Sequence, residues 1–162
     1  MASFIKVPAS NDDTVLVNRD SVRYCRSSQK TPDKTTFMFV NTMVIDKASP
    51  LFEGLGGMHN VYANASAAAA LKKGGSYPNG SQFVTDLHDF TITEGSYVEG
   101  ARKGVATMIK DSKRYASTGG WGFQFWAEGD AKKPQVTDSA KQCFACHEPK
   151  KDQDYVYSTY IP

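Results

Sequence analysis

The chain has 162 residues, enough for one domain that buries about two-thirds of its unfolded surface, so a disulfide scaffold is not needed. The 19 Lys and Arg nearly balance the 17 Asp and Glu and occur singly or in short pairs, which argues against a nucleic-acid surface. No segment approaches the roughly 20 consecutive apolar residues of a membrane-spanning helix.

The N-terminal part of the chain contains few clear signals. Residues 1–34 are polar and mixed, and the only element we expect there is a short helix ending over residues 20–25. A strand is predicted over residues 35–45, because β-branched and aromatic side chains dominate this segment. The strongest helix prediction is Ala65–Lys73, which is rich in good helix formers and is followed by Gly74-Gly75.

The middle of the chain is rich in strand signals. A tight turn is predicted at residues 77–80, where Asn-Gly supplies positive φ angles. Strands are predicted over three segments that follow it, namely residues 82–92, 104–110 and 121–126.

The last part of the chain is expected to be helical. After a loop at Pro134, a short helix begins near Thr137 or Asp138, either of which can cap it. Central strands with helices on either side predict the α+β class, as an antiparallel β-sheet with flanking helices in a single domain over residues 1–162.

Residues 143–147 read Cys-Phe-Ala-Cys-His, the C-x-x-C-H pattern of c-type haem attachment. Two thiols three residues apart on a helix reach the two vinyl groups of one porphyrin, and the next residue places an imidazole beneath the iron. The sequence therefore predicts one covalently bound haem c on a C-terminal haem-attachment helix. Cys143 and Cys146 form the thioether bonds, and His147 is the axial iron ligand.

Two other uses of this motif are less well supported. A structural zinc site needs two further ligands, and His59, His88 and Cys25 form no second pair with suitable spacing. A thioredoxin-like motif lies at an early strand-to-helix junction, whereas this motif lies near the end of the chain. Cys25 is then the odd cysteine, expected to be an ordinary thiol.

Further segments carry a family likeness. They are, in chain order, residues 58–64 (MHNVYAN), 77–81 (YPNGS), 110–115 (KDSKRY), 118–123 (TGGWGF), 143–147 (CFACH) and 154–158 (DYVYS). In these segments the chain resembles the cytochrome P-460 family, which also contains the cytochromes c′-beta. The likeness covers roughly residues 35–162 and is most specific towards the C-terminus.

The resemblance implies a homodimer in the bacterial periplasm. No signal peptide is visible, and Met1-Ala2-Ser3 reads as the start of a chain from which it has been removed. It also implies a five-coordinate iron with His147 on the proximal side and an open distal side for small nitrogen species. Members of the P-460 type carry an additional lysine–porphyrin bond and oxidise hydroxylamine with a distal carboxylate. Members of the c′-beta type lack that bond and bind nitric oxide. A redox partner protein is expected in either case.

The distal carboxylate of the P-460 type has three candidates here. Glu128, directly after the strand at residues 121–126, is the leading one, and Asp86 and Glu94 follow it. Each also reads as an ordinary surface carboxylate.

The cross-linking lysine is left open. Lys72, Lys73 and Lys110 lie near the expected pocket strands, and the first two read better as a solvated helix end. Thr85 and Asp86 stand where a side chain could face the pocket.

A sixth iron ligand would change the function to electron transfer. His59 and His88 are the histidine candidates, although the resemblance favours an open site. The methionine candidates, which spacing alone does not remove, are Met38, Met43, Met58 and Met108. Most aromatic side chains on the strands are expected in the core, with one or two lining the distal pocket.

Three functions follow from these expectations. The first is oxidation of hydroxylamine together with nitric oxide chemistry. The second is binding of nitric oxide without turnover, and the third is electron transfer.

Overall fold

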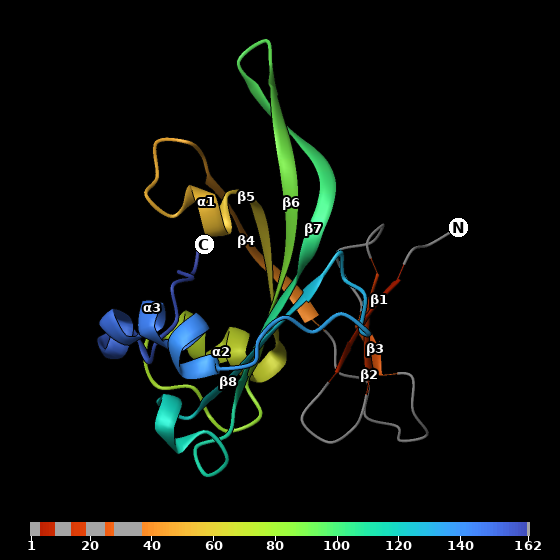
Figure 1. Cartoon of the computed structure of the whole chain (residues 1–162). Helices are drawn as coiled ribbons and strands as arrows, with labels where there is room; N and C mark the ends of the chain where they lie inside the picture. The colour runs from red at the N-terminus through yellow and green to blue at the C-terminus, as the bar shows by residue number, and fades with distance from the viewer. Residues whose placement is uncertain (1–3, 9–13, 19–24, 28–36, 162) are drawn as a thin grey trace.

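The computed structural model describes residues 4–8, 14–18, 25–27 and 37–161 of the chain (Figure 1). The N-terminal part contains a three-stranded antiparallel sheet of β1 (Phe4–Pro8), β2 (Thr14–Asn18) and β3 (Cys25–Ser27). Of the helix expected over residues 20–25, residues 20–24 lie outside the described part, and Cys25 lies in β3 instead.

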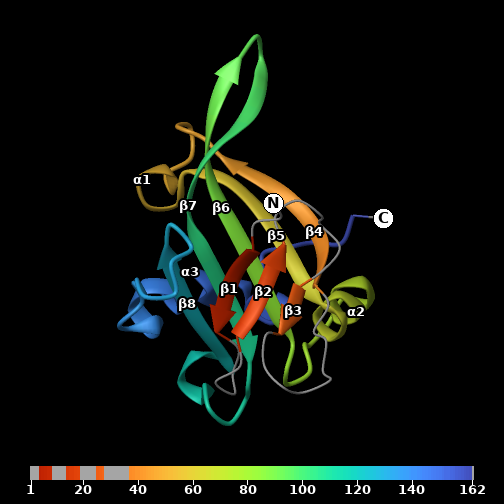
Figure 2. The same cartoon turned by 90° about the vertical axis from the view of Figure 1, so that its right-hand side faces the viewer.

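The larger sheet has five antiparallel strands that neighbour one another in chain order, as Figure 2 shows. They are β4 (Phe37–Ile45), β5 (Gly57–Asn64), β6 (Gln82–Thr93), β7 (Ser96–Lys110) and β8 (Trp121–Ala127). With helices beside this sheet, the predicted α+β class is confirmed. All four predicted strands are present.

Two parts of the sheet were not predicted. Strand β5 contains His and Asn, which are poor strand formers, and it forms because β4 and β6 pair with it on both sides. The first half of β7 is polar and pairs with β6 through a tight turn at Glu94 and Gly95, whose φ angles are 51° and 78°. The resulting β6–β7 hairpin extends well beyond the neighbouring strands (Figures 1 and 2).

Helix α2 (Ala65–Lys73) has the predicted bounds. The Asn64 side chain caps its start by accepting a hydrogen bond from the backbone N–H of Ala67 at 3.0 Å. Gly74, with a φ of 62°, ends it. A shorter helix, α1 (Phe52–Leu55), connects β4 to β5.

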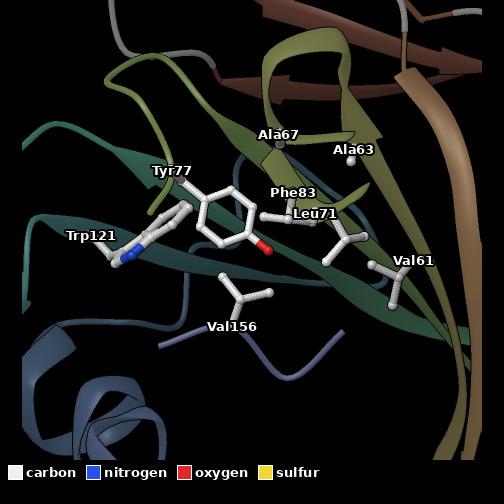
Figure 3. Packing of buried hydrophobic residues seen from close by; sticks show 8 residues of the cluster. All are labelled: Val61, Ala63, Ala67, Leu71, Tyr77, Phe83, Trp121 and Val156. Carbon is white, nitrogen blue, oxygen red and sulfur yellow. The ribbon is translucent and has the colours of Figure 1, made fainter. Parts of the chain in front are cut away.

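The main hydrophobic core lies between α2, the sheet and the C-terminal segment (Figure 3). Its largest member is Trp121, which is fully buried and whose ring is 5.6 Å from that of Tyr77 and 6.1 Å from that of Phe83. The other buried members are Val61, Ala63, Ala67, Leu71 and Val156.

Strand alternation gives β6, β7 and β8 two distinct faces. The side that faces this core, called the site face below, carries Phe83, Thr85, Ala106, Met108, Lys110, Trp121, Phe123 and Phe125. The opposite face carries Val84, Asp86, Val105, Thr107, Gln124 and Trp126.

After β8 the chain runs through a loop into a helical segment that has a kink at Lys150. It consists of a π-helical turn (Ala140–Phe144), α3 (Ala145–His147) and a 3-10 turn (Glu148–Gln153). The N-cap position is Ser139, whose side chain forms no capping hydrogen bond. Of the two predicted caps, Asp138 accepts a hydrogen bond from the backbone N–H of Lys141 at 3.2 Å. In the described part of the chain, no helix has the length and apolar character needed to cross a bilayer.

Candidate haem site

The two thiols of the motif lie on the helical segment, three residues apart. The Cys143 side chain is half-buried and that of Cys146 is exposed, and neither forms a disulfide bond. Residues at this spacing lie on the same side of a helix. Burial, followed by the neighbouring Cys146, raises the pKa of the Cys143 thiol.

The His147 imidazole is held in one orientation. Its Nδ1 lies 2.7 Å from the backbone oxygen of Tyr155. Because a carbonyl oxygen only accepts, Nδ1 carries the proton and the lone pair is on Nε2. Burial lowers the pKa of His147 and outweighs the opposing effect of this hydrogen bond. The ring is therefore a neutral imidazole with Nε2 available, the form in which histidine binds iron.

Aromatic side chains surround this imidazole and fasten the helical segment. The His147 ring is 5.0 Å from the ring of Phe123 on the site face and 5.2 Å from that of Tyr157. The Tyr157 hydroxyl donates a hydrogen bond to the backbone oxygen of Cys146 at 2.7 Å. The Phe144 ring, between the two cysteines, packs 5.1 Å from that of Tyr155. Motif and C-terminal segment thus form one packed unit.

The turn that supplies the Tyr155 carbonyl has an unusual backbone. Asp154 and Tyr155 have φ angles of 49° and 66°, in the left-handed region that residues with a Cβ rarely occupy. The Tyr155 ring lies directly over Gly119, where an added Cβ would come within 2.3 Å of it. Gly119 is therefore required both for its own φ of 63° and for this contact.

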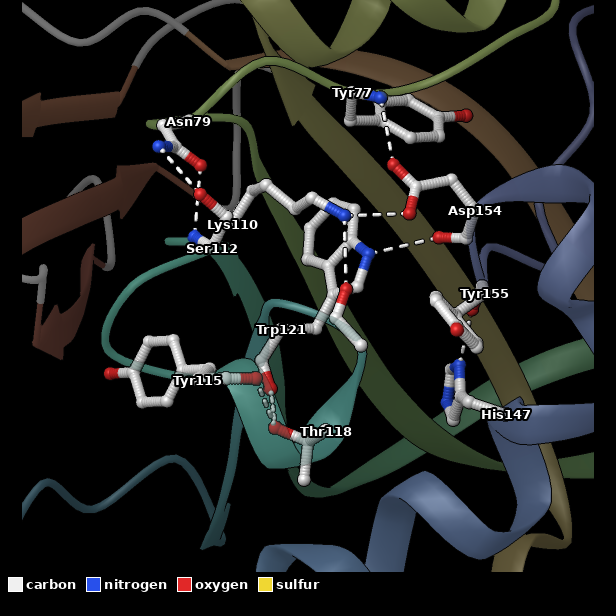
Figure 4. A network of polar contacts seen from close by, with 11 residues as sticks. Tyr77, Asn79, Lys110, Ser112, Tyr115, Thr118, Trp121, His147, Asp154 and Tyr155 are labelled. Atoms are coloured by element: carbon white, nitrogen blue, oxygen red, sulfur yellow. Dashed lines mark hydrogen bonds and ion pairs between the residues drawn. The ribbon is translucent and has the colours of Figure 1, made fainter.

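Asp154 holds the turn against the sheet through three hydrogen bonds (Figure 4). Its Oδ1 accepts from Lys110 Nζ at 2.6 Å, and its Oδ2 accepts from the backbone N–H of Tyr77 at 2.8 Å. Its backbone oxygen accepts from Trp121 Nε1 at 2.9 Å. Lys110 also donates to the Gly119 oxygen at 3.1 Å and lies 5.0 Å from the centre of the Trp121 ring.

The three distal-acid candidates occupy different places. Glu128 lies in the turn after β8, with its side chain 69% exposed and paired with Lys133 at 2.8 Å. Asp86 lies on the opposite face of the sheet, where Arg102 binds both its carboxylate oxygens. Glu94 is exposed in the β6–β7 turn.

The remaining predicted residues are also placed. Thr85 is half-buried on the site face. His88 is buried on the opposite face, with Nε2 3.0 Å from Asp86 Oδ1. His59 Nε2 lies 2.7 Å from the backbone oxygen of Leu55. His88 Nδ1 also contacts a backbone oxygen, that of Gly100 at 3.0 Å, but the ring lies on the opposite face, away from the C-x-x-C-H motif.

The three candidate lysines differ in exposure, and two of them lie at a solvated helix end, as expected from the sequence. Lys72 and Lys73 are exposed in the last turn of α2. Lys110 is buried and bound to Asp154, a role that the sequence alone did not assign. The available signal was the likeness in residues 110–115 and 154–158, which marked both partners without connecting them.

These residues fit a haem. Two unpaired thiols on one helical turn and an adjacent imidazole with Nε2 available form the donor set that a c-type haem requires. Beside them the site face presents half-buried apolar side chains, those of Met108, Phe123 and Phe125. The surface cleft of about 330 Å³ near Phe52 includes none of these residues. Among the described side chains, no group of three His, Cys, Asp or Glu is arranged to hold a bare metal ion.

Comparison with known proteins places the chain in a family. The family model described as cytochrome P460 matches residues 37–158, most of the chain. A search of the curated proteins finds no match. The matched range includes the sheet, the C-x-x-C-H motif and the Asp154–Tyr155 turn. The chain therefore belongs to the cytochrome P460 family and is a haem cytochrome.

Proposed function

We propose that the chain carries one haem c, attached covalently through Cys143 and Cys146, with His147 as the axial ligand of the iron. The observation that carries this proposal is the 2.7 Å contact between His147 Nδ1 and the Tyr155 carbonyl, which leaves Nε2 for a metal. Covalent attachment requires each thiol to add across one vinyl group, with the S–H proton moving to the vinyl carbon.

We further propose that the distal side is open and that the protein acts on small nitrogen species, by hydroxylamine oxidation and nitric oxide chemistry. The bound haem supplies the redox centre for this reaction. Support for an open side comes from the two other described histidines. His88 lies on the opposite face, and His59 Nε2 is engaged by Leu55. The apolar rings of Phe123 and Phe125 limit the access of water on the site face.

Glu128 is proposed as the carboxylate that receives protons from hydroxylamine. Its support is its position directly after β8, the strand that carries Phe123 and Phe125. The ion pair with Lys133 must open for this role, and at 69% exposure of the Glu128 side chain such opening costs little.

Binding of nitric oxide without turnover is the second candidate. The observation that favours it is the state of the lysines, since Lys110 is bound to Asp154 and Lys72 and Lys73 are exposed at a helix end. None of the three is free beside the C-x-x-C-H motif to form the extra porphyrin bond. Electron transfer, the third candidate, requires a sixth protein ligand in place of the open side.

Family membership also supports a periplasmic homodimer that exchanges electrons with a redox partner protein. These proposals concern the setting of the site and do not alter its chemistry.

Two experiments test the function. The optical spectrum of the reduced holoprotein separates the candidates. A strongly red-shifted Soret band indicates the cross-linked type, an ordinary five-coordinate spectrum favours gas binding, and a low-spin six-coordinate spectrum indicates electron transfer.

Hydroxylamine oxidation with an artificial electron acceptor then tests Glu128. The Glu128→Ala variant is expected to lose turnover by about 10²-fold or more, the usual contribution of a general base. Lys133→Met is the matched control, because it removes the ion pair and leaves the carboxylate, and it should keep turnover. Equal turnover in both variants and the wild type would remove Glu128 from the mechanism.

A further inference from the structure

We propose that Lys110, Trp121 and Asp154 form a positioning device for His147, called the proximal clamp below. They hold the Asp154–Tyr155 turn so that its carbonyl accepts the hydrogen bond from His147 Nδ1. The inference rests on the proposed ligation by His147. It assigns to a buried ion pair a role in setting the strength of the iron–histidine bond.

Asp154 is held by contacts to three of its oxygen atoms. The Lys110–Asp154 pair is nearly buried, with 10% and 14% of the two side chains exposed. Tyr77 and Trp121 occupy the other carboxylate oxygen and the backbone oxygen of Asp154. Asp154 is therefore bound at three acceptors by groups from three separate parts of the sheet and its loops, as Figure 4 shows.

The backbone of the Asp154–Tyr155 turn depends on these contacts. Two consecutive non-glycine residues in the left-handed region are disfavoured, and such a conformation persists only where surrounding contacts determine it. Asp154 is held by its three hydrogen bonds, and the ring of Tyr155 packs against Gly119. The carbonyl of Tyr155 thus has little freedom to move away from His147.

The position of the Tyr155 carbonyl affects how strongly His147 binds iron. A hydrogen bond from Nδ1–H to a fixed acceptor orients the imidazole and increases the basicity of Nε2. If the acceptor is released, Nε2 becomes a weaker donor. The iron–histidine bond then weakens, and the reduction potential rises because the ferric state loses more stabilisation than the ferrous state.

The test uses the holoprotein and three variants. Asp154→Asn and Lys110→Met each break the ion pair, and Trp121→Phe removes the N–H donor while it keeps a smaller aromatic ring in the core. Resonance Raman spectra of the ferrous protein give the iron–histidine stretching frequency, and a redox titration gives the midpoint potential. We expect a lower frequency and a higher potential in all three variants, with the smallest change in Trp121→Phe.

The matched control is Asp86→Asn. It breaks a comparable buried carboxylate–cation pair with Arg102, on the opposite face of the sheet and without contact to His147. It should lower stability and leave both readouts at the wild-type values. The clamp would be overturned if the frequency and the potential kept their wild-type values in Trp121→Phe and in each of Asp154→Asn and Lys110→Met that incorporates haem. An equal shift of both in Asp86→Asn would also overturn it. Absence of an iron–histidine mode in the wild-type protein would instead refute ligation by His147.

Discussion

Asp86 and Asp154 are two buried carboxylates paired with cations on opposite sides of the same sheet. Asp86 is bound by Arg102 from the neighbouring strand β7 and lies 3.0 Å from Nε2 of His88 on its own strand β6. Asp154 is bound by Lys110, which is 44 positions away in the chain, compared with 16 for the Asp86–Arg102 pair. The chemistry is alike, but the first pair joins neighbouring strands and the second joins the C-terminal segment to the sheet.

The face of the sheet on which a buried ion pair lies determines whether its loss changes only stability or also the properties of the haem. On the opposite face, loss of the pair affects the packing of the β6–β7 hairpin. On the site face, the same loss also releases the turn that orients His147. Variants on the two faces should therefore separate stability from the properties of the haem.

The largest effect is expected for the two tryptophans of β8, which point to opposite faces. Trp121→Ala should lower the free energy of unfolding by about 3–5 kcal/mol, as expected for a large aromatic core residue, and should also disturb the haem spectrum. Trp126→Ala, which is nearly as buried, should destabilise without altering the spectrum. Urea unfolding with an optical spectrum of each variant checks both. A spectral change only in Trp126→Ala would reverse the assignment of the faces.

Removal of Asp86 gives the next largest effect. Asp86→Ala leaves the largely buried Arg102 guanidinium without its carboxylate, and we expect a loss of about 3 kcal/mol. Thermal and urea unfolding measure this loss. Replacement of the exposed Asp89, whose contact with Lys103 is 3.7 Å, provides the control and should have little effect. A negligible loss in Asp86→Ala would show that the pair adds nothing to the opposite face.

Alkaline pH should act on the site face through Tyr77. Burial, and then the negative charge of Asp154, raise the pKa of Tyr77 to about 12, compared with 10 for an ordinary tyrosine. The unfolded state therefore releases its proton first, and stability present below pH 10 is lost as the pH rises from 10 to 12. This loss is about 2–3 kcal/mol at most.

Tyr77→Phe should lack this part of the alkaline loss. Urea midpoints between pH 8 and 12 measure it, with Tyr97→Phe in the exposed hairpin as the control. If Tyr77→Phe follows the wild-type curve over the whole range, neither burial nor Asp154 raises the pKa of Tyr77 in the folded protein.

The smallest effect is expected for the exposed pair. Lys133→Met breaks the contact with Glu128 in open solvent, where side-chain freedom and screening leave little net stabilisation. Its unfolding midpoint should coincide with that of the wild type at both low and high salt. A clear loss would mean that this turn contributes to stability more than its exposure suggests.

Local signals predicted much of this architecture. Ala65–Lys73 has its cap and its terminating glycine next to it in the sequence. The C-x-x-C-H motif by itself indicates haem attachment. The strands at residues 82–92 and 121–126 were also predicted, although only the paired register shows which residues share a face.

The contacts that support His147 were not predictable in this way. From the sequence, Lys110 was placed near the pocket strands, and Asp154 was only part of a segment with a family likeness. Nothing in the local sequence indicates that these two residues, 44 positions apart, form a pair. Strand β5 escaped prediction for a similar reason, since its pairing partners, and not its own composition, make it a strand.

Proteolytic peptide mapping of the mature holoprotein shows which residues hold the haem. The account predicts that the haem remains on the peptide that contains Cys143, Cys146 and His147, with both thiols resistant to alkylation and Cys25 reactive after unfolding. The same map would reveal any lysine bonded to the porphyrin as a second attached peptide. Haem released during digestion, with Cys143 and Cys146 both alkylated, would contradict the account.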